Sequence, residues 1–313
     1  MNIASTSSAG IIFSIGDIHG DLDALLRILL GLGLINKNGD WAGGSATLVM
    51  MGDLVDRGPD SFSVMNHVMT LESQAEQAGG QVISLLGNHE LFVASGNFQF
   101  FRAREVLELE GIWIDDRHGL DAIFRGNSIW AEWLRRRPVW VKIGRTIFVH
   151  AGIEKWALEW GFDELNAALH AWMAHFQGVA PEPREDTFWL TEDGGGGPIW
   201  SRAFIARSED GRHDPELPAV IDQFLNRHQA QHLVAGHNPT KNTGYQIAWP
   251  HPQLGEQVAL IDTGISMAIG GKLSALAIKG EQLQPYHFER GTELLPLTTA
   301  LRRQYLSQLE VYR

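Results

Sequence analysis

The chain has 313 residues, of which 44% are hydrophobic, so it is long enough to bury a large core as one big domain or as two. Its net charge of −12 repels nucleic-acid phosphate and anionic lipid, so we expect neither as a partner. The sequence has no cysteine and no signal-peptide pattern, and none of its apolar stretches approaches the roughly 18 residues of a membrane span. We therefore expect a cytoplasmic protein with no membrane contact.

Short apolar runs that end in turns predict the strands. Near-continuous apolarity over four to seven residues is typical of strands buried on both faces. Two helical patterns separate the first three strands: Asp21 can cap one helix, and Ser61 can open another that ends at Gly79 and Gly80. This alternation predicts an α/β fold, and the closely spaced later strands predict an antiparallel part and hence a mixed sheet. The predicted strands cover residues 11–15, 46–51, 81–86, 143–149 with a turn at Gly144 and Arg145, 232–235, 258–261 and 273–278.

Two polar, helical segments interrupt this pattern at about residues 92–138 and 153–230. We expect them to be helical insertions into a single catalytic domain that spans residues 1–313. Tryptophans are frequent in these segments, and we expect seven of them to form the apolar core of a small cap. The alternative is that one or two of them line the site and stack on an aromatic substrate group. The seven are Trp130, Trp133, Trp156, Trp160, Trp172, Trp189 and Trp200.

Five glycine-containing motifs follow the predicted strands and carry carboxylate, imidazole and amide side chains. Because open α/β sheets place their sites at the carboxyl ends of the strands, all five can converge at one edge. This mixture of ligand types suits Mn, Fe or Zn ions better than Ca or Mg ions. The sequence therefore predicts a site for divalent cations. The motifs are Gly16-Asp17-Ile18-His19-Gly20, Gly52-Asp53-Leu54-Val55-Asp56-Arg57-Gly58, Gly87-Asn88-His89-Glu90, His150-Ala151-Gly152 and Gly236-His237-Asn238-Pro239.

The order of these motifs closely resembles that of the calcineurin-like metallophosphoesterases, in the phosphoprotein phosphatase branch. Within that branch the bacterial Shewanella-like protein phosphatases look nearest. The resemblance spans about residues 11–288, and the segments GPIWSR (197–202) and LIDTGISMAIGG (260–271) are similar to the Shewanella-like group. It implies the fold of that superfamily, a mixed-sheet β-sandwich flanked by helices (α/β, or α+β) with helical cap insertions.

The resemblance also implies a role for each matching residue. Two divalent ions, manganese with iron or zinc as alternatives, would activate a water that attacks the phosphorus in line. His89 would protonate the leaving oxygen, and Asp56 would orient His89. Arg57 would grip the phosphate, with Arg202 as a second clamp; Arg207 and Arg212 are alternatives to Arg202. The implied ligands are Asp17 and His19 for one ion, Asp53 for both ions, and Asn88, His150 and His237 for the other.

The sequence therefore predicts a phosphatase for phosphomonoesters, either phosphoproteins, phosphotyrosine included, or small phosphoesters. A symmetrical dinucleoside tetraphosphate hydrolase is the close alternative, because GDLVDRGPDS and HAG resemble that group too. Those enzymes lack an acid in the place of Asp56 and carry Asp in the place of Glu90, and an acid beside His89 favours a poor leaving group. A non-catalytic phosphate-sensing scaffold is the third possibility, which the complete residue set disfavours. We expect Glu90 to accept backbone hydrogen bonds rather than to bind metal.

Overall fold

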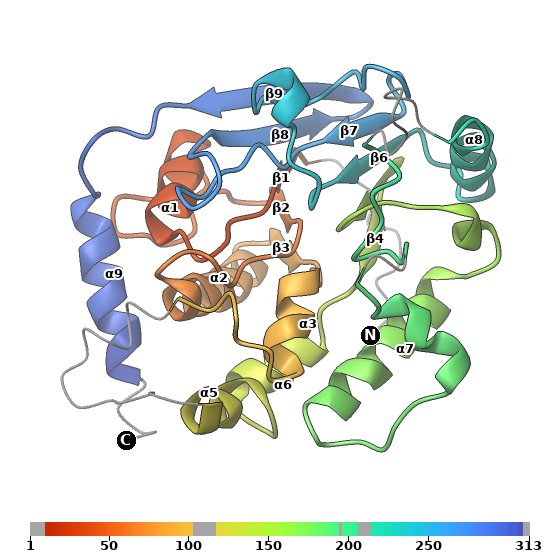
Figure 1. Cartoon of the computed structure of the whole chain (residues 1–313). Helices are drawn as coiled ribbons and strands as arrows, with labels where there is room; N and C mark the ends of the chain where they lie inside the picture. The colour runs from red at the N-terminus through yellow and green to blue at the C-terminus, as the bar shows by residue number, and fades with distance from the viewer. Residues whose placement is uncertain (1–9, 103–116, 194–195, 206–213, 309–313) are drawn as a thin grey trace.

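The computed structural model describes residues 10–102, 117–193, 196–205 and 214–308, and two mixed sheets form its centre (Figure 1). The five-stranded sheet has the order β3-β2-β1-β8-β9, and the four-stranded sheet has the order β4-β5-β6-β7. The predicted mixed α/β fold is confirmed, because parallel and antiparallel pairs occur in both sheets. The strands are β1 (Ile12–Ile15), β2 (Thr47–Met50), β3 (Gln81–Ser84), β4 (Trp140–Ile143), β5 (Thr146–Val149), β6 (His232–Ala235), β7 (Val258–Leu260), β8 (Leu273–Lys279) and β9 (Gln282–Phe288).

The two sheets pack face to face as a sandwich. Successive side chains of a strand point to opposite faces, and β2 illustrates the result. Val49 lies in the apolar cluster between the sheets, together with Phe148 of β5 and Val234 of β6. Leu48 and Met50 lie in the larger cluster on the outer side, which the helices cover. Both faces of the strand are therefore apolar, as its unbroken apolar sequence predicts.

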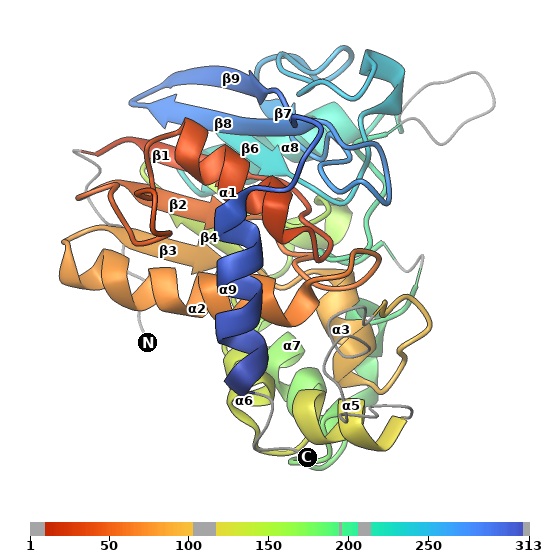
Figure 2. The same cartoon turned by 90° about the vertical axis from the view of Figure 1, so that its left-hand side faces the viewer.

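Three helices lie on the outer side of the five-stranded sheet: α1 (Leu22–Gly31), α2 (Ser61–Gln77) and α9 (Pro296–Leu306). Helix α9 packs across both α1 and α2 (Figure 2). Helix α1 begins as predicted, since the Asp21 carboxylate accepts a hydrogen bond from the amide of Ala24 at 3.0 Å. Ser61 is the first residue of α2, as predicted, and Asp60 precedes it as the N-cap residue.

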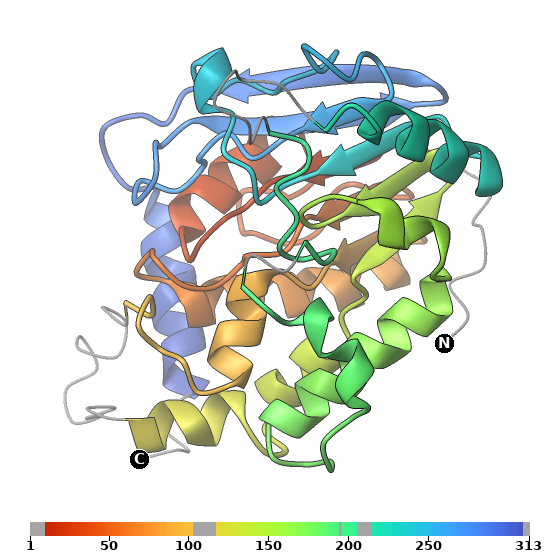
Figure 3. The same cartoon turned by 45° about the vertical axis from the view of Figure 1, so that its right-hand side comes forward.

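The remaining helices gather at one end of the sandwich and along the four-stranded sheet. Helix α7 contacts α3, α6 and β4, and Figure 3 shows α8, in teal, beside the four-stranded sheet. The seven tryptophans expected to form the cap core are buried or half-buried, as a core role requires. The helices are α3 (Asn88–Ala94), α5 (Arg117–Phe124), α6 (Ile129–Arg135), α7 (Phe162–Phe176) and α8 (Leu217–Arg227), with the 3₁₀ turns η1 (Lys155–Leu158), η2 (Glu185–Leu190) and η3 (Lys241–Thr243).

The sequence prediction left out β9 and nearly all of β4, which ends where the predicted run of residues 143–149 begins. Strand β9 pairs only with β8 at the edge of its sheet, and of its residues only Leu283 is buried, so it carries no apolar run. Helix α9 begins at Pro296, because proline suits the first turn of a helix. Within the described residues, no helix is long and apolar enough to cross a membrane.

Candidate active site

The five predicted motifs lie where the parallel strands β1, β2, β3, β5 and β6 end, and the fold brings them to one edge of the sandwich. Five of their residues have a positive φ angle although none is glycine. Such backbone conformations cost about 1–3 kcal/mol each and persist only where the surroundings enforce them, most often at functional sites. The five are His19 (45°), Asp53 (49°), Asp56 (68°), Arg57 (65°) and His237 (59°).

Two groups of buried side chains could each hold a metal ion, and Asp53 belongs to both. In the first group the ligand atoms of His19, Asp53 and His89 lie within 4.8 Å of one another, and in the second those of Asp53, His150 and His237 do. The Asp53 carboxylate places one oxygen 3.7 Å from Nε2 of His19 and the other 3.5 Å from Nε2 of His150. This is the arrangement that a carboxylate shared between two ions requires.

The histidines present one ring nitrogen each toward Asp53. Nδ1 of His150 donates to the carbonyl of Met51 at 2.6 Å, and Nδ1 of His19 donates to that of Val55 at 3.3 Å, so Nε2 is left for the site in both. Backbone carbonyls orient metal-binding histidines in this way. Nε2 of His237 is buried and has no hydrogen-bond partner among the described residues. An unpaired buried nitrogen is costly, and a cation would satisfy it.

The charge states of these groups also suit a cation. Burial lowers the pKa of His19 to about 3, and it lowers those of His150 and His237 as well, so that all three rings are neutral near pH 7. A neutral imidazole is the form that binds metal. Burial by itself would raise the pKa of Asp53, but the surrounding histidines, His150 first, outweigh it and hold that pKa well below its usual range. Asp53 is therefore an anion at every physiological pH.

Asp17 lies at the site but in neither group. Both of its carboxylate oxygens lie 3.0 Å from the backbone N–H of His237, which donates to them. A Cβ atom on Gly236 would come within 2.3 Å of that carboxylate, so only glycine permits this approach. Its pKa is raised well above the ordinary value by burial and by the neighbouring carboxylates of Asp262 and Asp53.

Asp262 is a site residue that sequence reasoning missed. It is fully buried, and burial raises its pKa to about 7, with Asp53 adding to the effect. It lies two residues after the end of β7, as the five predicted motifs follow their strands, and Gly264 lies two residues further on. That strand–Asp–Gly pattern was the available signal. A buried concentration of negative charge is unfavourable unless a cation or a proton offsets it.

His89 of the first candidate metal group also forms a pair with a second titratable residue, Asp56. Nδ1 of His89 and Oδ2 of Asp56 lie 2.7 Å apart, and both side chains are buried. Burial lowers the pKa of His89, but the negative charge of Asp53 and the hydrogen bond that His89 donates to Asp56 outweigh it, so that pKa lies above its ordinary value. On the other side of the ring, the Arg57 guanidinium donates to Nε2 at 3.3–3.4 Å. His89 is therefore held by a carboxylate on one nitrogen and faces the exposed Arg57 with the other.

Glu90 accepts backbone hydrogen bonds, as predicted. One carboxylate oxygen accepts from Leu54 at 2.8 Å and from Val55 at 3.3 Å, and the other accepts from Asp53 at 2.8 Å and from Gly87 at 2.9 Å. The side chain therefore ties the loop after β2 to the loop after β3. Each loop carries a predicted ligand, so Glu90 sets the distance between them.

Of the predicted phosphate-binding residues, Arg202 lies beside the second metal group. Its guanidinium donates to the carbonyl of His237 at 3.0 Å and to the side chain of Asn238 at 3.2 Å. Asn88 also lies in this part of the site, with its side-chain oxygen 3.1 Å from Nε2 of His150. The alternatives to Arg202, which are Arg207 and Arg212, lie outside the described residues.

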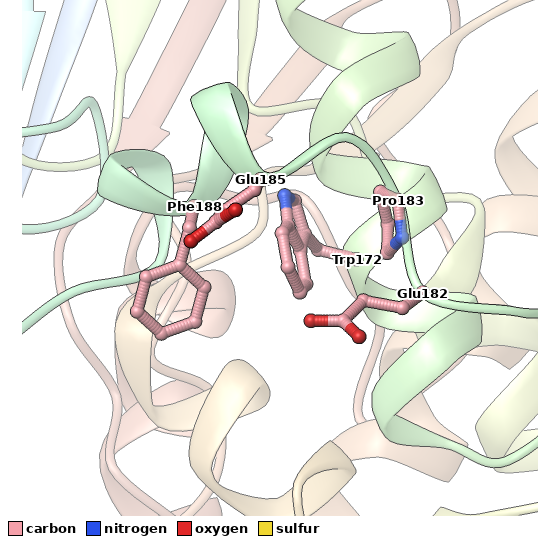
Figure 4. A pocket seen from close by; sticks show the side chains of 5 residues that line it. All are labelled: Trp172, Glu182, Pro183, Glu185 and Phe188. Atoms are coloured by element: carbon pink, nitrogen blue, oxygen red, sulfur yellow. The ribbon is translucent and has the colours of Figure 1, made fainter.

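A separate hollow of about 440 Å³ lies on the helical region (Figure 4). The Trp172 ring lies between Phe188 on one side and Pro183 with Glu182 on the other, and Glu185 completes the lining. None of these five residues is a predicted site residue. The hollow is therefore distinct from the site at the strand ends.

A family model described as calcineurin-like phosphoesterase matches residues 12–241. The chain belongs to the calcineurin-like phosphoesterase family. An uncharacterized protein of Schizosaccharomyces pombe is 32% identical to it over 281 residues, which are 86% of this chain and 77% of that protein. The Shewanella-like protein phosphatase 1 of Plasmodium berghei is 29% identical over 266 residues, which are 82% of this chain and 68% of that protein. The resemblance predicted from the motifs is confirmed.

The fold of this phosphoesterase is similar to the crystal structure of the cold-active protein-tyrosine phosphatase of a psychrophilic Shewanella species. The TM-score is 0.71 at 24% identity, over 90% of this chain and 81% of that one. A symmetrical bis(5'-nucleosyl)-tetraphosphatase of Acidovorax is 31% identical over only 154 residues, which are 47% of this chain and 46% of that protein. Members of this family hydrolyse phosphate esters with divalent metal ions, so the chain is a phosphoesterase, as its motifs predict.

Proposed function

We propose that this phosphoesterase is a phosphatase that removes phosphate from phosphomonoesters, with phosphoproteins as its main substrates. The observation that carries the proposal is the buried pair of His89 and Asp56, 2.7 Å apart, of which His89 also belongs to a candidate metal group. An imidazole oriented by a carboxylate is a general acid, and a general acid is most valuable when the leaving group is a poor one such as an alkoxide or phenoxide. The similarity to a Shewanella-like protein phosphatase over 82% of this chain supports a protein substrate.

We assign the cation site to the six side chains expected from the sequence. Asp53 is shared by both ions, with His19 in the first group and His150 and His237 in the second. We add Asp17 to the first ion, as the family resemblance implies. Asn88 supplies an amide oxygen next to His150. When bound, two divalent ions supply charge stabilisation for the phosphoryl group and activation of water. The mixed oxygen and nitrogen donors support manganese, with iron or zinc as alternatives.

The protein's own side chains orient the phosphate and handle the proton. The exposed Arg57 guanidinium points its donors toward the site and can bind two phosphate oxygens at once. Arg202 acts as a second clamp from the other side. Once Arg57 binds the phosphate instead of Nε2 of His89, that nitrogen can carry the proton for the leaving oxygen, while Asp56 fixes Nδ1 and stabilises the imidazolium.

A dinucleoside tetraphosphate hydrolase is the second candidate, supported by a similarity to such an enzyme over 47% of the chain. Its leaving group is a nucleotide, which departs without a strong general acid. The pair of His89 and Asp56 therefore favours the monoesterase. A phosphate-sensing scaffold would need no such pair at all. The single-domain organisation over residues 1–313 and a cytoplasmic location stay predictions.

The test is phosphate release by metal-stripped protein that has been reconstituted with manganese. Four substrates separate the candidates: p-nitrophenyl phosphate, a phosphotyrosine peptide, a phosphoserine peptide and diadenosine tetraphosphate. We expect metal-dependent turnover of the monoesters and little turnover of the tetraphosphate. Faster turnover of the tetraphosphate would move the chain to the nucleotide-hydrolase branch. Two bound ions without turnover of any substrate would favour the scaffold.

A further inference from the structure

The loop of residues 56–60, between β2 and α2, carries two proposed functional side chains on a strained backbone. Asp56 and Arg57 both have positive φ angles, of 68° and 65°. A residue with a Cβ atom keeps such an angle only where its surroundings enforce it. The Asp56 carboxylate can orient His89 only while this loop keeps its shape, so the contacts that fix the loop bear on the reaction.

Two backbone hydrogen bonds hold the loop from the side of the site. The N–H of Asp56 donates to Oγ of Ser61 at 3.1 Å. The N–H of Arg57 donates to the carbonyl of Phe100 at 2.8 Å, and the Phe100 ring lies 5.4 Å from the His89 ring, centroid to centroid. These two contacts fix the strained residues themselves, but neither holds the end of the loop that enters α2.

That end of the loop is held by the C-terminal helix. Asp60, the residue before α2, is buried, and its carboxylate makes no capping hydrogen bond to that helix. The carboxylate forms an ion pair with Arg302 of α9, 242 residues further along the chain, in which Nε lies 2.6 Å from Oδ1 and Nη2 lies 2.7 Å from Oδ2. Because both oxygens are engaged, the guanidinium fixes the direction of the carboxylate as well as its position. The backbone N–H of Asp60 donates to the carbonyl of Gly20 at 2.8 Å, which joins the same point to the loop after β1.

Other contacts keep α9 docked across α1 and α2 without involving the loop (Figure 2). At the start of the helix, Oγ1 of Thr298 donates to the Asp23 carboxylate at 2.8 Å. Near its end, the hydroxyl group of Tyr305 lies 3.0 Å from Nδ1 of His67, and both side chains are buried. We therefore expect the helix to stay in place when the side chain of Arg302 is changed. The loop would then lose one specific support.

We propose that Arg302 is a positioning residue for the general-acid pair, and that it acts from the C-terminal helix through Asp60. By fixing Asp60, it helps to keep the backbone of Asp56 in the strained conformation that directs the carboxylate to His89. Without this support the loop relaxes toward ordinary backbone angles, and Asp56 holds the imidazole less firmly. The inference rests on the proposed function, because the roles of Asp56 and His89 are taken from there.

The test compares kcat of Arg302→Gln and the wild type, both with manganese, on a poor and a good leaving group. A phosphoserine peptide needs a proton on its leaving oxygen, whereas p-nitrophenyl phosphate does not. We expect kcat to fall about tenfold to a hundredfold on the peptide, a part of the roughly 10²–10⁴-fold that a general acid contributes, and about threefold or less on p-nitrophenyl phosphate. A displaced Arg57 would affect both substrates, since both carry the phosphate that it binds, so the ratio of the two losses isolates the general acid.

Three variants serve as controls. Arg303→Gln removes the same charge from the exposed neighbour on α9 and should keep the wild-type ratio of the two kcat values. Tyr305→Phe removes the contact with His67 and should lower the melting temperature without changing that ratio. Arg302→Lys keeps the charge but not the two-pronged geometry, so it should recover part of the loss; it also carries the comparison if Arg302→Gln fails to fold. Metal content and melting temperature are measured for every variant.

An unchanged ratio in both Arg302→Gln and Arg302→Lys would overturn the inference. A change of the same size in Tyr305→Phe would overturn it too, because looser docking of the whole helix would then explain the effect. Failure of the proposed function has a different signature: the wild-type protein with manganese would release phosphate from neither substrate. That result would remove the inference together with the function on which it rests, whereas an active wild type with unchanged variant ratios would remove the inference alone.

Discussion

Replacement of Glu90 by glutamine tests the carboxylate that joins two loops of the site. Glu90 offers two oxygens to four backbone N–H groups, whereas glutamine offers one oxygen and an amide group that itself donates. Two buried N–H groups therefore lose their acceptor. At about 1–3 kcal/mol for each unsatisfied group, Glu90→Gln should lower the free energy of unfolding by about 2–6 kcal/mol. That is a large fraction of the roughly 5–15 kcal/mol that stabilises a typical protein.

The assay is thermal unfolding of the metal-free protein at pH 8. Burial and Asp53 raise the pKa of Glu90 to about 7, so the carboxylate is ionised at that pH. We expect the melting temperature to fall by about 4–12 °C, at roughly 2 °C per kcal/mol for a chain of this size. Glu281→Gln is the control, because its exposed ion pair with Arg145 is worth about 0–1 kcal/mol. Equal melting temperatures for Glu90→Gln and the wild type would refute the reasoning.

Three further predictions concern the metal and the proton donor. Asp53→Asn should lose both metal and activity, because the carboxylate lies in both metal groups. The metal content and the activity of this variant are compared with those of Asp222→Asn, a control at an exposed position. His89→Ala should keep its metal but lose kcat by about 10²–10⁴-fold for phosphoserine and less for p-nitrophenyl phosphate, which leaves without a proton. Burial raises the pKa of Asp262 and that of Glu90 to about 7. These two groups therefore stabilise the folded protein most below about pH 4, and that stabilisation is lost as the pH rises through 7. Manganese should consequently raise the melting temperature more at pH 8 than at pH 5.5.

Each of these predictions has a contrary outcome. Near-normal activity of Asp53→Asn would exclude a carboxylate shared by two essential ions. An equal loss of rate on both substrates in His89→Ala would mean that His89 is not the proton donor. For the third prediction, the contrary result is that manganese raises the melting temperature equally at both pH values. That result would show that protonation of the buried carboxylates does not stabilise the metal-free site.

Local signals in the sequence were enough to predict most of the strands and the residues at their ends. Apolar runs identify β1, β2 and β3 because strands covered on both faces have no polar positions. Strand β9 gives no such signal, because it lies at an edge and only Leu283 is buried. The start of α1 at Asp21 and the role of Glu90 were also predictable. Asp21 accepts a hydrogen bond from the backbone of Ala24, three residues away, and Glu90 accepts one from the backbone of Gly87 in its own motif.

The sequence by itself determined the chemistry of this protein: which residue types stand at the strand ends, in what order, and hence the family and its use of metal ions. Only the tertiary structure decided their partners. The second metal group joins Asp53 to His150 and His237 across the two sheets, a distance that depends on how the sheets pack. The same packing places Asp262 at the site and Phe100 beside His89. No short-range pattern encodes these contacts, because they arise when buried apolar faces bring distant segments together.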